Sequence, residues 1–199
     1  TAVKQGGASS ALCIDSSASA LELAARNAEL NGVSSQVEFR KGDVPHLLLE
    51  LHEQGERFDI VVLDPPKLAR SRSGLERAAK AYLKLNSSAI RLLSPGGILA
   101  SCSCSGLIDQ NMFEEILSKA ALEVGCTMQL RQHLLPLGGG QVEEGGDGVQ
   151  HHLDPGIPGL LVLRHEHRDC LGQRTNNSSV ARRKIPAAGG NLLEQLHQL

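Results

Sequence analysis

Two short segments of the sequence combine residue types that could do chemistry. The first, Asp64-Pro65-Pro66-Lys67, directly follows the apolar run 58–63. Two consecutive prolines supply no backbone N–H groups and favour a rigid, extended turn, which would hold the carboxylate beside any bound ligand. A plain turn that ends a strand explains the same four residues equally well.

The second segment, Ser101-Cys102-Ser103-Cys104-Ser105-Gly106, brings two thiols. A thiolate is a strong nucleophile where the pKa of its thiol is lowered, and a neighbouring acid can protonate or hydrogen-bond the substrate that it attacks. The alternative is that both thiols are small buried hydrophobes, as most free cysteines are.

Alternating strands and helices must position these segments. Apolar runs predict strands at residues 11–14, 37–40, 58–63, 98–103 and 127–130. Helical spacing, with Asp109 as an N-cap and Gly125 as a stop signal, predicts helices over residues 16–32, 46–51, 78–92 and 109–125. This alternation is typical of a parallel α/β sheet, which binds ligands at the carboxyl ends of its strands. We expect Asp64 and a thiol at one such crevice, with the thiol on the next strand but one.

The periodicity is lost beyond about residue 134. Glycine-rich and polar runs predict that residues 134–199 are mostly loop or disordered tail, with a strand-like run only at 157–163. Five residues there could be metal ligands: His151, His152, His165, His167 and Cys170. They lack the paired spacing of zinc sites, so we expect no metal.

Composition limits how the chain could bind nucleic acid. The formal net charge is −2 at pH 7, and there are one Tyr, three Phe and no Trp. Overall basicity and aromatic platforms for bases are therefore scarce, and any RNA contact must be local. Six basic residues opposed only by Glu76 could grip phosphates or form an ordinary solvated helix face: Lys67, Arg70, Arg72, Arg77, Lys80 and Lys84.

The five cysteines show no Cys-x-x-Cys spacing, and no run of about 18 apolar residues could span a membrane. We therefore expect reduced thiols, no membrane partner and a cytoplasmic location, or an organelle if the source is eukaryotic.

Several stretches in a fixed order carry a family resemblance. They are FDIVVLDPPK at 58–67, YLKLN at 82–86, LSPGGIL at 93–99 and SCSG at 103–106, preceded by DSS at 15–17, AL at 20–21 and ARNAELNG at 25–32. This combination resembles the catalytic domain of class I S-adenosylmethionine (SAM)-dependent methyltransferases. It is most similar to the 23S rRNA (cytosine-5)-methyltransferases that carry an N-terminal PUA domain.

The resemblance implies a Rossmann-like fold, with helices on both faces of the sheet, and SAM (S-adenosyl-L-methionine) as the cofactor. It implies that Asp15 binds the ribose hydroxyls of SAM, that Asp43 lies beside the adenine, and that Asp64 and Pro65 border the cofactor. An acid at a strand end also accepts ribose hydroxyls in dinucleotide-binding folds. A helix cap or a turn is the alternative role for Asp15 and Asp43.

For the reaction, the resemblance makes Cys104 the nucleophile that adds to C6 of a cytosine in rRNA, so that C5 attacks the methyl group of SAM. Asp64 would hold the base through N3 and N4, and Cys102 would only pack. The base must leave its stack or be single-stranded, which loops of rRNA allow. The implied RNA-binding residues are Pro66, Lys67, Arg70 and Arg72.

The sequence also departs from the family. The first motif, a strand and a Tyr-Thr-Gly-Gly-like loop, is missing, as are the PUA domain and an Asp-His-Pro segment after Arg131. We expect residues 1–133 to be an N-terminally truncated methyltransferase domain that lacks its first strand and by itself binds SAM poorly. Two other functions stay open: methylation of an exocyclic amine or of guanine, which needs no thiol, and an inactive fragment that acts at most as a binding module.

Overall fold

The computed structural model describes residues 2–132 and 159–165. The chain divides into two units, which are described separately: one contains residues 2–47, and the other contains residues 48–132 and 159–165. The possible metal ligands His151, His152, His167 and Cys170 lie outside the described residues, as does most of the expected tail.

The first unit is a β-α-β arrangement. Strands β1 (Ala11–Asp15) and β2 (Val37–Lys41) pair in parallel, and α1 (Ala18–Leu30) with the short 3₁₀ helix η1 (Ser34–Gln36) connects them. The Ser17 hydroxyl caps α1 by accepting a hydrogen bond from the N–H of Ala20, and Gly32 follows the helix with φ of 69°. These elements confirm the predicted strand, helix and strand.

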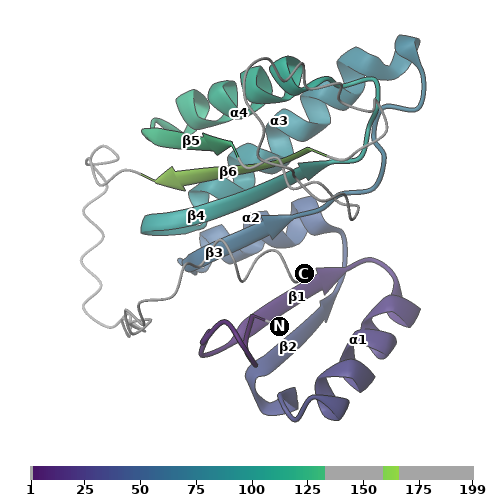
Figure 1. The fold of residues 1–199 in the computed structure, drawn as a ribbon, viewed down its shortest axis with the longest axis vertical. Helices are drawn as coiled ribbons and strands as arrows, with labels where there is room; N and C mark the ends of the chain where they lie inside the picture. Colours follow the sequence, from purple (N-terminus) through teal and green to yellow (C-terminus); the bar gives the residue numbers. More distant parts are fainter. Residues whose placement is uncertain (1, 133–158, 166–199) are drawn as a thin grey trace, which may run out of the picture. The chain divides into compact units, whose positions relative to one another are not determined.

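The second unit contains a four-stranded sheet in the order β3-β4-β6-β5 (Figure 1). Strand β3 (Phe58–Leu63) is parallel to β4 (Leu93–Ser103), whereas β6 (Gly159–His165) is antiparallel to β4 and to β5 (Met128–Gln132). Helix α2 (Val44–Glu53) precedes β3 and begins in the first unit. The remaining elements are η2 (Arg72–Gly74), α3 (Leu75–Arg91) and α4 (Gln110–Val124).

Helices α3 and α4 pack against each other, and α3 also contacts β3 and β4 (Figure 1). The core of this unit consists mainly of the apolar residues of these two helices, together with Leu48 and Leu51 of α2, Leu63 of β3 and Leu99 of β4. The rings of Tyr82 and Phe113 meet edge to face, with centroids 5.4 Å apart, which joins the two helices inside the core. No helix of the described part of the chain is both long enough and apolar enough to span a membrane.

The boundaries of α4 confirm the local signals in the sequence. The Asp109 carboxylate accepts a hydrogen bond of 2.8 Å from the N–H of Met112, and Gly125 ends the helix in the left-handed conformation with φ of 73°.

Two strands differ from the prediction. Strand β4 begins at Leu93 rather than at Ile98, because residues 94–97 form an irregularity in its pairing with β3. The strand-like run expected at 157–163 is β6, which inserts between β4 and β5. Sequence patterns reveal such a strand but not its position in the sheet, because pairing partners are chosen by tertiary packing.

Candidate active site at the ends of two parallel strands

The Asp64 carboxylate lies where β3 leaves the sheet. Leu63 is buried as the last residue of the strand, and Asp64 is exposed immediately after it. Pro65 is half-buried and Pro66 and Lys67 are exposed, so this turn presents one acid and one base to solvent. The chain enters the core again at Ala69, which is fully buried. The turn is therefore anchored on both sides.

Cys104 lies at the corresponding end of the neighbouring strand. Strands β3 and β4 pair directly, with Leu63 opposite Ser101, so the expected separation by one further strand was wrong. Cys104 is exposed, and its Sγ donates a hydrogen bond of 3.5 Å to the main-chain oxygen of Pro65. The structure thus brings the 64–67 turn and the Cys104 thiol together, because parallel neighbours end at the same edge of a sheet.

Cys102 differs from Cys104 in its surroundings. Cys102 is half-buried, and burial raises the pKa of its thiol to about 11, with smaller contributions from the nearby Asp64 and Cys104. A thiol with this pKa is almost wholly protonated at neutral pH and is therefore a poor nucleophile.

Serines that alternate with the two cysteines make hydrogen bonds with α3 and with the loop after β3. Ser101 donates a hydrogen bond of 2.7 Å to the side chain of Asn86, and Ser103 donates one of 3.2 Å to the hydroxyl of Tyr82. The Oγ of Ser105 accepts a hydrogen bond of 3.2 Å from the N–H of Ala69. Sequence reasoning missed these serines. The signal was their alternation with the cysteines, because successive side chains of a strand point to opposite faces, which can have different roles.

In the first unit, Asp15 is the last residue of β1, and Asp43 follows shortly after the end of β2. The Asp15 carboxylate accepts a hydrogen bond of 2.7 Å from the N–H of Ser17, and its main-chain oxygen accepts one of 3.1 Å from Gly42. These bonds bring the ends of the two strands, and hence the two acids, close together. The Asp43 carboxylate accepts a hydrogen bond of 3.3 Å from the N–H of His46 at the start of α2. Each acid therefore makes a turn or cap contact.

The basic residues around the 64–67 turn are exposed. Lys67 and Arg70 lie in the loop after β3, and Arg72 begins η2. On α3, Lys80 forms an ion pair of 2.7 Å with Glu76, which raises the pKa of Lys80 and lowers that of Glu76. Glu76 thus partly neutralises the charge of Lys80, as expected if this side of α3 is an ordinary solvated helix face. Lys67, Arg70 and Arg72 are the basic residues nearest to Asp64 in the sequence.

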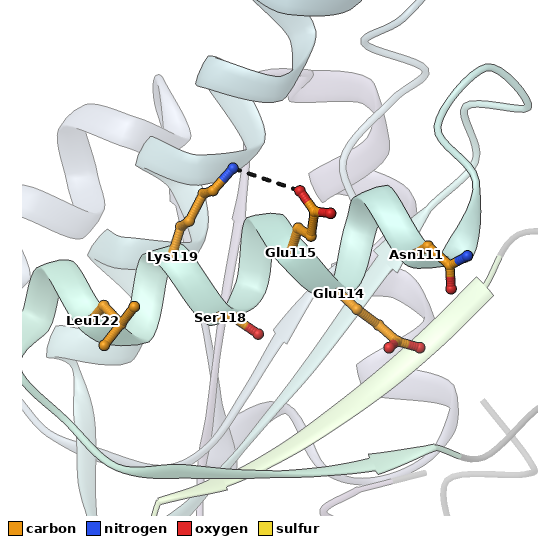
Figure 2. Close-up of a pocket in the computed structure, with 6 residues that line it drawn as sticks. All are labelled: Asn111, Glu114, Glu115, Ser118, Lys119 and Leu122. Carbon is orange, nitrogen blue, oxygen red and sulfur yellow. Dashed lines mark ion pairs between the residues drawn. The ribbon is translucent and has the colours of Figure 1, made fainter.

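A shallow surface depression elsewhere belongs to α4 alone. Figure 2 shows its six residues along the outer side of this helix, where Lys119 and Glu115 form an ion pair of 3.6 Å. It contains neither of the strand-end groups, and nothing in its side chains suggests catalysis. Among the described residues, no cluster of three His, Cys, Asp or Glu side chains could hold a metal ion.

Comparison with known proteins gives consistent matches. Residues 2–145 match the profile of the methyltransferase domain family. The ribosomal RNA large subunit methyltransferase I of Aeromonas salmonicida is 45% identical over 131 residues, which are 65% of this chain and 33% of that protein. The protein of the same name from Photobacterium profundum is 40% identical over 161 residues, which are 80% of this chain and 38% of that protein. The chain therefore spans about a third of the length of these relatives.

Solved structures show the same fold. A candidate SAM-dependent methyltransferase from Streptococcus mutans superposes with a TM-score of 0.59 at 17% identity, over 82% of this chain and 40% of that one. This likeness confirms the expected Rossmann-like α/β fold.

Proposed function

Because the chain belongs to the methyltransferase domain family, we propose that it transfers a methyl group from SAM to large-subunit ribosomal RNA. Within the family we assign it to the cytosine-C5 methyltransferases whose members carry a PUA domain, with residues 1–133 as the methyltransferase domain. The observation that carries this assignment is the hydrogen bond between Cys104 Sγ and the Pro65 oxygen. It joins an exposed thiol to the acid-proline-proline turn, and C5 chemistry needs a nucleophile at that position.

The acids at the ends of β1 and β2 suit the ribose and adenine of SAM. Asp15 is exposed at the end of a parallel strand, and only its Oδ1 is engaged among the described residues, by the N–H of Ser17. Its Oδ2 is therefore available to accept a hydroxyl proton of the ribose. Asp43 is held beside Asp15 by the bond from Gly42 to the Asp15 main chain, which suits a role next to the adenine. Bound SAM would supply an electrophilic methyl group.

The proposed reaction divides the work between Cys104 and Asp64. The thiol proton of Cys104 leaves to the Asp64 carboxylate, and the sulfur forms a bond to C6 of the cytosine. The electron pair of the C5–C6 double bond moves to C5, which would take up the methyl group of bound SAM as the bond from this methyl to the sulfonium sulfur breaks and S-adenosylhomocysteine is left. Asp64, now protonated, donates a hydrogen bond to N3 and so stabilises the charge that develops on the ring. Loss of the C5 proton to water and cleavage of the S–C6 bond would then restore the double bond and release the Cys104 thiolate, which takes its proton back from Asp64.

The remaining residues would hold the RNA and the cofactor in place. Pro65 would border the cofactor, while Pro66 and Lys67, which are exposed, would contact the RNA. Arg70 and Arg72 bind phosphates of an unpaired loop, from which the target base is extruded. Because the ribosomal RNA methyltransferases that the chain resembles are bacterial proteins, we place the reaction in the cytoplasm.

Tritium transfer from methyl-labelled SAM to unmodified large-subunit rRNA tests the proposal. The wild-type chain, at a SAM concentration high enough to offset the expected poor binding, is compared with Cys104→Ala and with the matched control Cys102→Ala, which removes the thiol two residues earlier, inside β4. Transfer should disappear in Cys104→Ala and persist in Cys102→Ala, and digestion to nucleosides should show the label at C5 of cytosine.

The other outcomes separate the alternatives. Transfer that persists in Cys104→Ala, with label on an exocyclic amine or on guanine, would replace the C5 assignment. No transfer by the wild-type chain would reject methylation by these 199 residues and leave a binding module.

A further inference from the structure

Tyr82 lies at the centre of a buried group of polar side chains behind the candidate nucleophile. Tyr82 on α3 is 0% exposed, and Ser103 and Ser105 are 7% and 2% exposed. The Tyr82 hydroxyl accepts a hydrogen bond of 3.2 Å from Ser103 and makes another of 3.3 Å with Ser105. One phenol therefore joins the two serines that flank Cys104. Buried hydroxyls need such partners, because an unpaired one costs free energy.

The group reaches the loop after β3 through Ser105. The Oγ of Ser105, besides contacting Tyr82, accepts the hydrogen bond of 3.2 Å from the N–H of Ala69. Cys104 makes the second link between the same two segments, through its contact of 3.5 Å with the Pro65 oxygen. Adjacent residues of the β4 end thus hold both ends of the Pro65–Ala69 loop.

Successive side chains of a strand point to opposite faces, and this explains why the serine contacts and the Cys104 contact lie on different sides of β4. Ser101 and Ser103 point towards α3, where they contact Asn86 and Tyr82, so Cys102 points to the opposite face of the sheet. The serine side is buried and polar, and the cysteine side opens to solvent at Cys104. A shift on the buried side therefore moves the backbone that carries the exposed thiol.

We propose that Tyr82 is a positioning residue for Cys104, acting through Ser103 and Ser105 to hold the thiol against the Asp64-Pro65 turn. This proposal rests on the proposed function, because it specifies how the same site is arranged. Tyr82 does not contact the substrate. Its hydroxyl sets the position of the sulfur relative to the base, and reactions of this kind lose up to 10²-fold in rate for a displacement of about 1 Å.

The test compares Tyr82→Phe with Ser101→Ala. Tyr82→Phe removes the hydroxyl but keeps the ring and its edge contact with Phe113. Ser101→Ala removes a hydroxyl of equal burial on the same face of β4, but one that contacts Asn86 rather than the loop after β3. Ser105→Ala is a second variant, which removes the acceptor for Ala69 directly. Thermal unfolding of each variant measures the structural cost.

Two readouts are expected to separate positioning from stability. In Tyr82→Phe and Ser105→Ala, kcat for methyl transfer should fall on the order of tenfold or more with the KM for SAM unchanged. Alkylation of Cys104 by iodoacetamide at neutral pH should become about fivefold faster, because the sulfur would no longer be held in its hydrogen bond to the Pro65 oxygen. This factor corresponds to the loss of one neutral hydrogen bond. Ser101→Ala should lower the unfolding temperature similarly while leaving both rates near those of the wild type.

The alkylation rate also keeps this proposal distinct from the proposed function. If the wild-type chain transfers no methyl group, the proposed function fails, but the alkylation rates of the same variants still decide whether Tyr82 positions the thiol. Equal alkylation rates in Tyr82→Phe, Ser105→Ala and Ser101→Ala would overturn the proposal and leave Tyr82 with a purely structural role.

Discussion

The sulfur of Cys104 donates a hydrogen bond of 3.5 Å to the main-chain oxygen of Pro65, across the ends of two neighbouring parallel strands. The two residues are 39 positions apart in the sequence. Neither Pro65 nor Pro66 has a backbone N–H, so the turn cannot close on itself through donors at these positions. The geometry keeps an exposed thiol next to an exposed carboxylate, and this pairing is the basis of the predictions about chemistry.

The thiols of Cys102, in β4, and Cys104, just beyond it, should differ in reactivity. At neutral pH, iodoacetamide should modify Cys104 well before Cys102, because Cys104 is exposed and burial raises the pKa of Cys102 to about 11. Cys102 should begin to react as the pH rises from 9 towards that value, since only its thiolate attacks. Mass spectrometry of tryptic peptides over a pH series measures both rates. Modification of Cys102 at neutral pH as rapid as that of Cys104 would contradict the assignment.

Arg70 and Arg72 should contribute to RNA affinity through phosphates. Changing both residues to Gln should weaken binding of a single-stranded rRNA loop, and it should reduce the slope of log K against log salt by about 0.7 for each phosphate that is no longer neutralised. Lys119→Gln is the control, because Lys119 lies on the outer side of α4 and pairs with Glu115. Fluorescence anisotropy at several salt concentrations gives the slopes. An unchanged slope in the double variant would favour the solvated-face interpretation.

Gly97 should be intolerant of a side chain. A Cβ atom there would lie 2.9 Å from the main-chain oxygen of Ser94, 3.1 Å from that of Asp59 and 3.2 Å from that of Phe58. Backbone cannot move aside as a side chain can, so Gly97→Ala should lower the free energy of unfolding by about 1–3 kcal/mol. Gly74→Ala, whose nearest neighbour would be a serine hydroxyl at 3.5 Å, should change it by less than about 1 kcal/mol. Urea denaturation compares the two variants.

The cap of α4 should contribute measurably to stability. Asp109→Ala removes the hydrogen bond of 2.8 Å to the N–H of Met112 and should cost about 1 kcal/mol in urea unfolding. Asp109→Asn and Asp109→Ser keep an acceptor at the cap and should recover most of this loss. If all three variants were equally destabilised, the negative charge rather than the hydrogen bond would be the stabilising feature.

His52 should make the stability of the second unit depend on pH. Its Nδ1 is buried without a hydrogen-bond partner among the described residues, and burial, followed by Arg57 and Arg91, lowers its pKa below 6.5, while Glu53 acts in the opposite direction. Below pH 6.5 the unfolded chain therefore binds this proton more readily than the folded chain, and the free energy of unfolding falls as the pH falls. Urea unfolding between pH 7 and pH 5 should show a shallower decline in His52→Gln than in the wild type. Parallel curves for the two proteins would exclude His52 as the cause.

Local signals in the sequence account for most of the secondary structure. Asp109 and Gly125 bound α4 because a cap and a left-handed glycine act within one turn of helix. The strand at 58–63 is visible because its run is almost continuously apolar, although only Leu63 is buried and Val62 is 51% exposed, so the strand is not covered on both faces as such runs usually are. The sequence also predicted that Asp64 and a thiol lie near each other, because the carboxyl ends of the strands of one parallel sheet lie at the same edge.

Other features were decided only by the tertiary structure. The pairing of β3 with β4, the insertion of β6 between β4 and β5, and the contact between Cys104 and Pro65 join residues that are distant in the sequence. Such partners depend on how sheets and helices pack and not on local preference. The sequence by itself determined which segments are strands and helices and which residues could do chemistry. The packing of α3 against β4 determined that the serines face Tyr82 and the core, and that Cys104 faces solvent, because one strand buries alternate side chains on opposite faces.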